Sequence, residues 1–193
     1  MDAKPGAVIA IDVDNLLISS FATATFLGGW NTFSLETGFE NLFSWVETFA
    51  SISCVYLYVP MGQCLRNDDL FQKFWERFKD KTIFEMIYCP RRKTQDGRLE
   101  DDVDRHLISH SPKIVRLMQP DVRYFILGSG DIDYSTMLWQ LKRAMDIQIA
   151  LAVGSEKSLS GAYRQMNNLI GKHPVTGEEL VHLFVPHKKQ TTA

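Results

Sequence analysis

The sequence predicts an α/β fold, a three-layer α/β/α sandwich built on a mainly parallel sheet of five to six strands. Short apolar runs rich in Val, Ile, Tyr and Phe recur along the 193-residue chain. Such runs are typical of strands that are covered on both faces. Between them lie segments with apolar residues three and four positions apart, as on one face of a helix. This alternation implies parallel strands joined by right-handed crossovers, the Rossmann-like arrangement.

The elements follow from these patterns in chain order. The predicted strands are 7–13, 52–59, 82–88, 123–127 and 147–153, with 182–185 as a candidate short edge strand. The predicted helices are 38–50, 68–79, 100–118 and 134–145. Ser111-Pro112 predicts a kink or break in the third helix, because proline removes a backbone donor. In open parallel sheets ligands bind beyond the carboxyl ends of the strands, where strand order reverses, so polar residues there are candidate functional residues.

Length and composition predict one domain over 1–193, with a motif-bearing core at about 7–170 and a short basic tail at 186–193. The net charge of −2 gives no general attraction for polyanions, so any such contact must come from local clusters. No apolar run reaches the roughly 18 residues that a membrane span needs, and the N-terminus has no signal-peptide pattern. Three cysteines without a CxxC pair fit reduced thiols. We therefore expect a cytoplasmic protein without a membrane partner.

Acidic residues follow three of the predicted strands. Asp12 and Asp14 end the first strand, and Asp131 and Asp133 follow the fourth in the stretch GSGDIDY. A third cluster, Glu100-Asp101-Asp102-Val103-Asp104, begins the helix after the third strand. If the first and fourth strands are neighbours, as doubly wound order favours, these acids converge in one crevice.

Converging carboxylates repel one another and raise each other's pKa unless a cation lies among them. Oxygen ligands without His or Cys suit Mg²⁺ or Mn²⁺. Such a site can activate water and neutralise the charge that develops on a phosphodiester during attack, which predicts phosphate-ester hydrolysis. The structural alternative is that Asp131 or Asp133, and likewise Asp101 or Asp102, cap the helices that follow them.

Three stretches resemble the motifs of NYN domains, the LabA-like branch of the PIN-like nuclease superfamily. VIAIDVDN is similar to an apolar strand that ends in Asp-x-x-Asn, matched by Asp12 and Asn15. FILGSGDIDYSTML resembles the signature Ser-Gly-Asp-x-Asp-Phe, with Tyr134 in place of Phe, and EDDVDRHLI resembles the Val-Asp segment at the head of a helix. The resemblance implies a PIN-like fold and a metal-dependent ribonuclease that uses Mg²⁺ or Mn²⁺.

Carried over to this chain, the resemblance implies a catalytic ligand set and a supporting set. Asp12, Asp104 and Asp131 would be metal ligands, and Asp133 a ligand or an orienter of water. Asn15 and Ser129 would support these carboxylates by hydrogen bonds. Asp14, Asp101 and Asp102, outside the carried-over motif positions, are further candidate supporting groups beside the site.

Two alternatives remain open. In a haloacid-dehalogenase-like phosphatase, Asp12 would be the nucleophile and Asp14 the general acid, although Leu16 and Ser135 depart from that pattern. The other alternative is a non-catalytic RNA-binding or interaction module with a vestigial metal site. It is favoured by the changed third motif, where Asp101-Asp102 replace a usual Lys-Gly.

The predicted substrate-binding residues lie in CPRRKTQDGR, directly after the third strand: Arg91, Arg92, Lys93 and Arg98. An acidic pocket in a chain of negative net charge needs such cations to hold RNA, the expected partner. A solvated loop is the structural alternative. Aromatic faces on the helices at 38–50 and 68–79 make a homodimer a candidate, and packing in the core explains these faces equally well. A regulatory protein is a further candidate partner.

Overall fold

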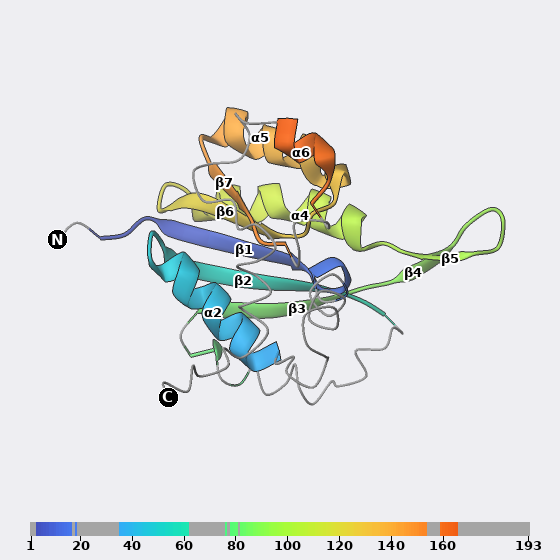
Figure 1. Cartoon of the computed structure of the whole chain (residues 1–193), viewed down its shortest axis with the longest axis horizontal. Coiled ribbons are helices and arrows are strands. Elements are labelled where there is room, and N and C mark those ends of the chain that lie inside the picture. Colours follow the sequence, from blue (N-terminus) through green and yellow to red (C-terminus); the bar gives the residue numbers. More distant parts are fainter. Residues whose placement is uncertain are drawn as a thin grey trace, which may run out of the picture.

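The computed structural model shows a parallel sheet with helices on both faces (Figure 1). It describes residues 3–16, 18, 35–61, 76, 78–80, 82–153 and 159–165. The candidate edge strand at 182–185, the basic tail and most of the helix expected at 68–79 lie outside these residues.

Five parallel strands form the sheet, as the sequence predicts, and their order is β3-β2-β1-β6-β7. Their bounds are β1 Gly6–Asp12, β2 Ser51–Pro60, β3 Ile83–Cys89, β6 Val122–Gly128 and β7 Gln148–Leu151. The chain builds outward from β1 through β2 to β3, and then returns to the other side of β1 with β6 and β7. Strand order therefore reverses between β1 and β6, the crevice where a doubly wound sheet binds its ligand.

β1 and β6 are direct neighbours, with Ile11 paired to Gly128 at their carboxyl ends. A Cβ atom at Gly128 would lie 2.9 Å from the Ile11 Cγ1 atom, so only glycine fits there without a shift of the core. Every residue of β1 is buried, including Asp12 at its end. The two strands that carry the predicted acids are thus held side by side.

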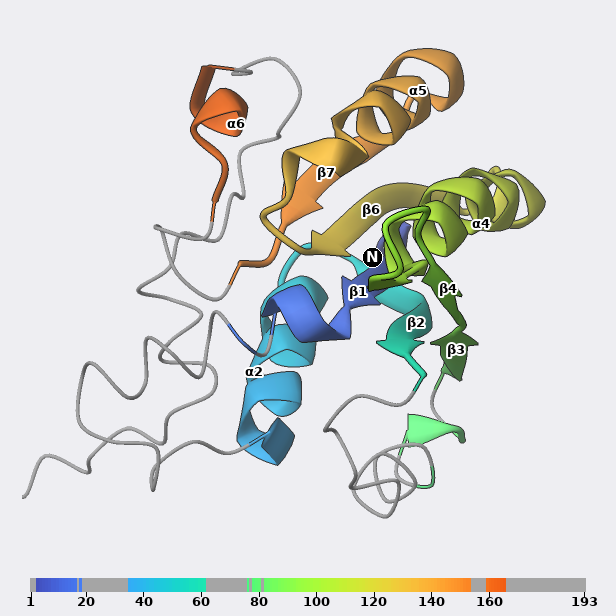
Figure 2. The same cartoon turned by 90° about the vertical axis from the view of Figure 1, so that its right-hand side faces the viewer.

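Helices cover both faces of this sheet (Figure 2). α4 (Val103–Met118) and α5 (Ser135–Met145) pack on one face, and α2 (Leu35–Glu47) packs on the other. Each buries the apolar stripe that its sequence predicts: Phe39, Leu42, Phe43 and Val46 in α2, Val103, Leu107, Ile114 and Val115 in α4, and Met137, Leu138, Leu141 and Met145 in α5. α6 (Gly161–Gln165) is a short helix after β7.

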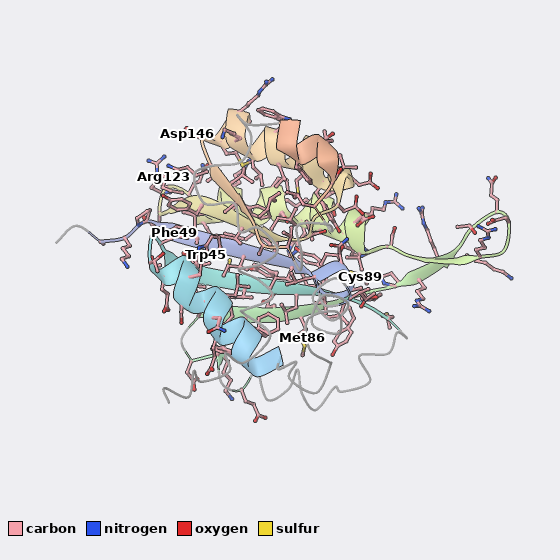
Figure 3. All side chains as sticks on the ribbon, in the orientation of Figure 1. Trp45, Phe49, Met86, Cys89, Arg123 and Asp146 are labelled. Atoms are coloured by element: carbon pink, nitrogen blue, oxygen red, sulfur yellow. The ribbon has the colours of Figure 1, made fainter. Side chains whose placement is uncertain are left out.

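Aromatic side chains close the end of the core that lies opposite Asp12. The centre of the Phe49 ring lies 5.1 Å from the centres of both the Trp45 and the Tyr124 rings. Figure 3 shows Trp45 and Phe49 at the end of α2. Cys54 and Cys89 are buried and remain thiols. None of the helices in the described part of the chain is both long and apolar enough to cross a membrane.

The segment between β3 and α4 differs from its prediction. Helix α4 begins at Val103, not at residue 100, and runs through Pro112 without a break. Pro112 has no N–H to donate to the Ile108 carbonyl, so one hydrogen bond of the helix is missing. Ile108 is solvent-exposed, and water can donate to its carbonyl instead. Burial of Leu107, Ile114 and Val115 on either side holds the helix together across the proline.

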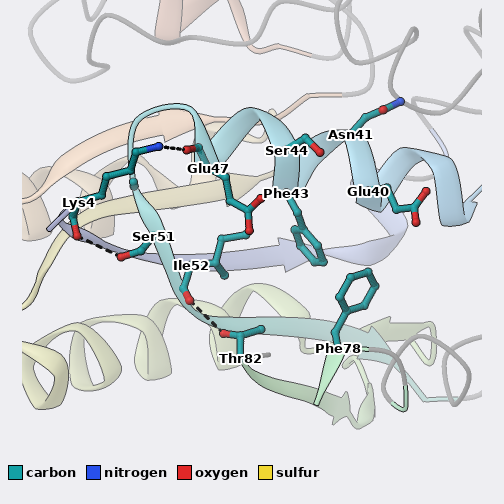
Figure 4. A pocket seen from close by; sticks show the side chains of 11 residues that line it. Lys4, Glu40, Asn41, Phe43, Ser44, Glu47, Ser51, Ile52, Phe78 and Thr82 are labelled. Atoms are coloured by element: carbon teal, nitrogen blue, oxygen red, sulfur yellow. Dashed lines mark hydrogen bonds between the residues drawn. The ribbon is translucent and has the colours of Figure 1, made fainter. Parts of the chain in front are cut away.

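A cavity of about 670 Å³ lies at the amino-terminal edge of the sheet, between α2 and the starts of β2 and β3 (Figure 4). Phe43 and Phe78 form its apolar wall, and Lys4 and Glu47 lie at its polar side. It is lined by none of the predicted acids, which lie at the opposite edge of the sheet.

Candidate functional site at the carboxyl ends of β1 and β6

Asp12 is the centre of the site because the chain turns directly from strand to helix at this residue. Residues 13–16 are helical, and the Asp12 Oδ1 atom accepts the Asn15 backbone N–H at 3.1 Å, as an N-cap does. The Asp12 Oδ2 atom accepts the Tyr134 hydroxyl at 2.9 Å. Asp12 is only 7% exposed, and each of its carboxylate oxygens accepts a hydrogen bond inside the protein.

Burial raises the pKa of Asp12 from 3.8 to about 6. The Asn15 N–H and the Tyr134 hydroxyl lower this pKa, and the charges of Asp104 and Asp14 raise it further. Asp14 therefore acts on the site through its charge, as a neighbour of Asp12. A buried carboxylate that is hard to ionise without help is a common feature of catalytic and metal-binding sites.

The Tyr134 hydroxyl bridges two of the predicted acids. It contacts the Asp12 carboxylate and also donates to Asp104 Oδ1, in the first turn of α4. A phenol has one proton, so it can donate to only one carboxylate at a time. With both acids ionised, the other contact would bring two lone pairs together. A proton on Asp12 or a cation between the acids removes that conflict.

Tyr134 is a site residue that the sequence analysis did not select. Its ring is fully buried, and burial with the two nearby carboxylates raises the pKa of Tyr134 far above its usual value. It ends the short 3-10 helix η2 (Ile132–Tyr134), directly before α5. The one signal for it in the sequence is a tyrosine at the position where the NYN signature Ser-Gly-Asp-x-Asp-Phe has phenylalanine.

The loop after β6 is tied to β1 by Asn15. The Asn15 Oδ1 atom accepts the Gly130 backbone N–H at 3.2 Å, which joins the two strand ends across the crevice. Ser129 is fully buried, and its Oγ atom accepts the Asp131 backbone N–H at 3.2 Å. Asn15 and Ser129 therefore bind the backbone of the loop after β6, not the carboxylates themselves. They support the acids indirectly, by holding that backbone in place.

Asp131 has the capping role that was the structural alternative. Its Oδ1 atom accepts the Asp133 backbone N–H at 3.0 Å and caps η2. Its carbonyl accepts the Tyr163 hydroxyl at 2.6 Å, and Tyr163 is buried. Asp133 is exposed. The two acids after β6 thus form a second group beside the Asp12–Tyr134–Asp104 group.

The acids after β3 are divided between two elements. Asp101 lies on strand β5 (Leu99–Asp101), so the expectation that it begins a helix is wrong. Asp102 occupies the N-cap position of α4, but its side chain makes no capping hydrogen bond. Its Oδ1 atom lies 3.8 Å from Arg92 Nε, and its Oδ2 atom lies 3.9 Å from His106 Nδ1. Asp102 therefore connects the head of α4 to the basic segment before it.

That basic segment is a β-hairpin, not the loop expected from its composition. β4 (Arg91–Lys93) pairs antiparallel with β5, and the turn between them is closed by Gly97 with φ +85°. The hairpin projects beyond the carboxyl ends of the strands, at the edge that carries Asp12 (Figure 1). Arg92, Lys93 and Arg98 are exposed, and Arg98 Nε lies 3.2 Å from Asp96 Oδ2. Arg91 is half-buried.

The chemistry of these donors fits a hard cation only in part. Across the described ranges given above, no group of three or more His, Cys, Asp or Glu side chains has the geometry of a metal site. Two carboxylates, Asp12 and Asp104, do converge on one point, and both offer the oxygen atoms that Mg²⁺ and Mn²⁺ prefer. The third oxygen at that point is the Tyr134 hydroxyl.

The chain matches no family model, and no curated protein is similar to it. Among solved structures, it is similar to a protein of unknown function from Vibrio parahaemolyticus, with a TM-score of 0.63 and 18% sequence identity. The similarity covers 91% of this chain and 94% of that one. At this identity the similarity shows the α/β fold alone, over nearly the whole chain.

Proposed function

We propose that this protein is a cytoplasmic Mg²⁺- or Mn²⁺-dependent ribonuclease that hydrolyses RNA phosphodiester bonds. The observation that carries the proposal is the convergence of the Asp12 and Asp104 carboxylates at the switch point of the sheet. They come from elements far apart in the chain, and one of them is buried with a raised pKa. The resemblance of the surrounding motifs to NYN domains supports the same conclusion.

Asp12 and Asp104 would hold the cation, which supplies charge neutralisation and an activated water when bound. Asp131, in the loop after β6, and Asp133, in η2, would complete the site from there. Asn15 holds that loop against β1 through the Gly130 amide. Its role is to keep the two strand ends at a constant separation, since small displacements of catalytic groups greatly lower the rate.

The hairpin β4–β5 would bind the RNA backbone. The hairpin projects at the same edge of the sheet as Asp12 (Figure 1), and its Arg92 and Lys93 are exposed, so a strand bound there would pass close to the site. Contacts of this kind bind phosphates without reading the base sequence. The side chains therefore favour a polyanion over a small phosphate ester.

A non-catalytic RNA-binding module is the second candidate, and the Tyr134 bridge favours it, because a hydroxyl stands between the two converging acids. The phosphatase alternative receives less support. A nucleophilic Asp12 needs an accessible oxygen, but both of its oxygens accept internal hydrogen bonds and the side chain is 7% exposed.

The test is cleavage of labelled single-stranded and structured RNA by the purified chain in Mn²⁺, Mg²⁺ or EDTA. We expect metal-dependent cleavage that is lost in Asp12→Asn and Asp104→Asn while RNA binding remains. Asp121→Asn is the matched control, because Asp121 is exposed at the opposite edge of the sheet, before β6.

RNA binding without cleavage in any metal would exclude the nuclease and favour the binding module. Turnover of p-nitrophenyl phosphate with beryllofluoride bound at Asp12 would instead favour the phosphatase.

A further inference from the structure

The Tyr134 hydroxyl lies at a point where two acids of the site meet. It contacts Asp12 Oδ2 at 2.9 Å and also Asp104 Oδ1, so it faces one oxygen of each carboxylate. A cation held between these same two oxygens would take the place of the hydroxyl. We propose that the Tyr134 hydroxyl substitutes for the cation between Asp12 and Asp104, and thereby lowers the affinity of the site for Mg²⁺ and Mn²⁺. This inference rests on the cation site of the proposed function.

The hydroxyl cannot easily leave this position. The Tyr134 ring is 0% exposed and lies between η2 and α5, two elements that both pack against α4. Asp104 is held from the other side, because it lies in the first turn of α4 next to the buried Val103. The two carboxylates and the phenol are thus fixed by three separate elements, β1, α4 and η2. A cation must either break the contacts of the hydroxyl or accept it as a weak neutral ligand.

The hydroxyl also separates the two carboxylates when no cation is bound. Asp12 and Asp104 lie close enough for the charge of Asp104 to act on Asp12. A hydroxyl between them replaces direct contact of two acids by a hydrogen bond to one of them, which is strong when the acceptor is charged. Tyr134 is therefore a positioning residue that keeps the site assembled in the metal-free protein at the expense of metal affinity.

The experiment measures Mn²⁺ binding by electron paramagnetic resonance at neutral pH in the wild-type chain and in Tyr134→Phe. Phenylalanine keeps the buried ring and removes only the hydroxyl. We expect Tyr134→Phe to bind Mn²⁺ roughly tenfold or more tightly, the change that corresponds to one lost charge-assisted hydrogen bond. Asp12→Asn combined with Tyr134→Phe should lose this binding, because the ion is held by Asp12.

Tyr58→Phe is the matched control. Tyr58 is also fully buried and is paired with Asp12 across β1 and β2, but its hydroxyl lies 2.9 Å from the Nδ1 atom of His110. Its Mn²⁺ affinity should equal that of the wild type. If Tyr134→Phe does not fold, Tyr134→Met removes the hydroxyl with a flexible side chain that can fill the space, and the same tightening is expected.

The outcomes separate this inference from the proposed function. If the wild type binds Mn²⁺ through Asp12 and Tyr134→Phe binds it equally or more weakly, the inference is wrong and the cation site stands. If no variant binds Mn²⁺, both are wrong. Tight binding that persists in the double variant would place the ion elsewhere and would also overturn the inference.

Discussion

Replacement of Asp12 by asparagine should stabilise the metal-free protein above pH 6 while it abolishes RNA cleavage. Burial raises the pKa of Asp12 from 3.8 to about 6, so the folded protein holds a proton that the unfolded chain releases. Each pKa unit corresponds to about 1.4 kcal/mol, and the shift corresponds to about 3 kcal/mol in the free energy of unfolding. Asparagine is a neutral match in shape for the protonated acid.

The sign of the effect depends on pH. The favourable contribution of the protonated Asp12 is fully present below about pH 4, and it is lost as the pH rises through about 6. The Asp12→Asn variant should therefore equal the wild type in stability near pH 4 and exceed it by about 3 kcal/mol near pH 8. The oxygen of the new side chain can accept the Asn15 N–H, and its NH2 group can donate to the Tyr134 oxygen while that hydroxyl donates to Asp104.

The assay is urea unfolding in EDTA at several pH values between 4 and 8, with circular dichroism as the readout. Asp121→Asn again serves as the control, and its effect should stay within about 0.5 kcal/mol at every pH because Asp121 is exposed. A difference between Asp12→Asn and the wild type that does not change with pH would refute the reasoning. So would a variant that is less stable at pH 8.

Two further predictions concern the support of the site and the binding of RNA. Asn15→Ala removes the acceptor of the Gly130 N–H and should lower the free energy of unfolding by about 1 kcal/mol, with faster hydrogen exchange at the Gly130 amide; unchanged exchange would contradict the link between the strand ends. Arg92→Ala with Lys93→Ala should weaken RNA binding and reduce the salt dependence of log K by roughly 2, measured by fluorescence anisotropy at several salt concentrations. If affinity falls but the salt dependence is unchanged, the hairpin does not contact phosphates.

The elements that determine the fold could be predicted because their signals are local. Continuous apolar runs gave the five strands, and apolar spacing gave the buried faces of α2, α4 and α5. The position of β1 beside β6 also followed from the general order of doubly wound sheets. The hairpin β4–β5 did not follow, because polar strands of three residues have no apolar pattern to detect.

From the sequence we could predict which strand ends carry acids, but not the role of each acid. Asp12 could be selected from sequence because a carboxylate inside an apolar run has few structural roles. Asp131 and Asp102 could not be assigned, since an acid before a helix has the same sequence pattern whether it caps the helix or binds a ligand. Only the structure showed that Asp131 caps η2 and that Asp102 does not cap α4.

By itself the sequence determined the fold class, the strands and the edge of the sheet where the acids gather, because these depend on burial and periodicity along the chain. The tertiary structure decided which acids meet. It brought Asp104 and Asp12 to the same Tyr134 hydroxyl, and the sequence marked Tyr134 only as a tyrosine where the NYN signature has phenylalanine. Contacts between residues far apart in the chain depend on how α4 packs over β1, and no local pattern specifies that packing.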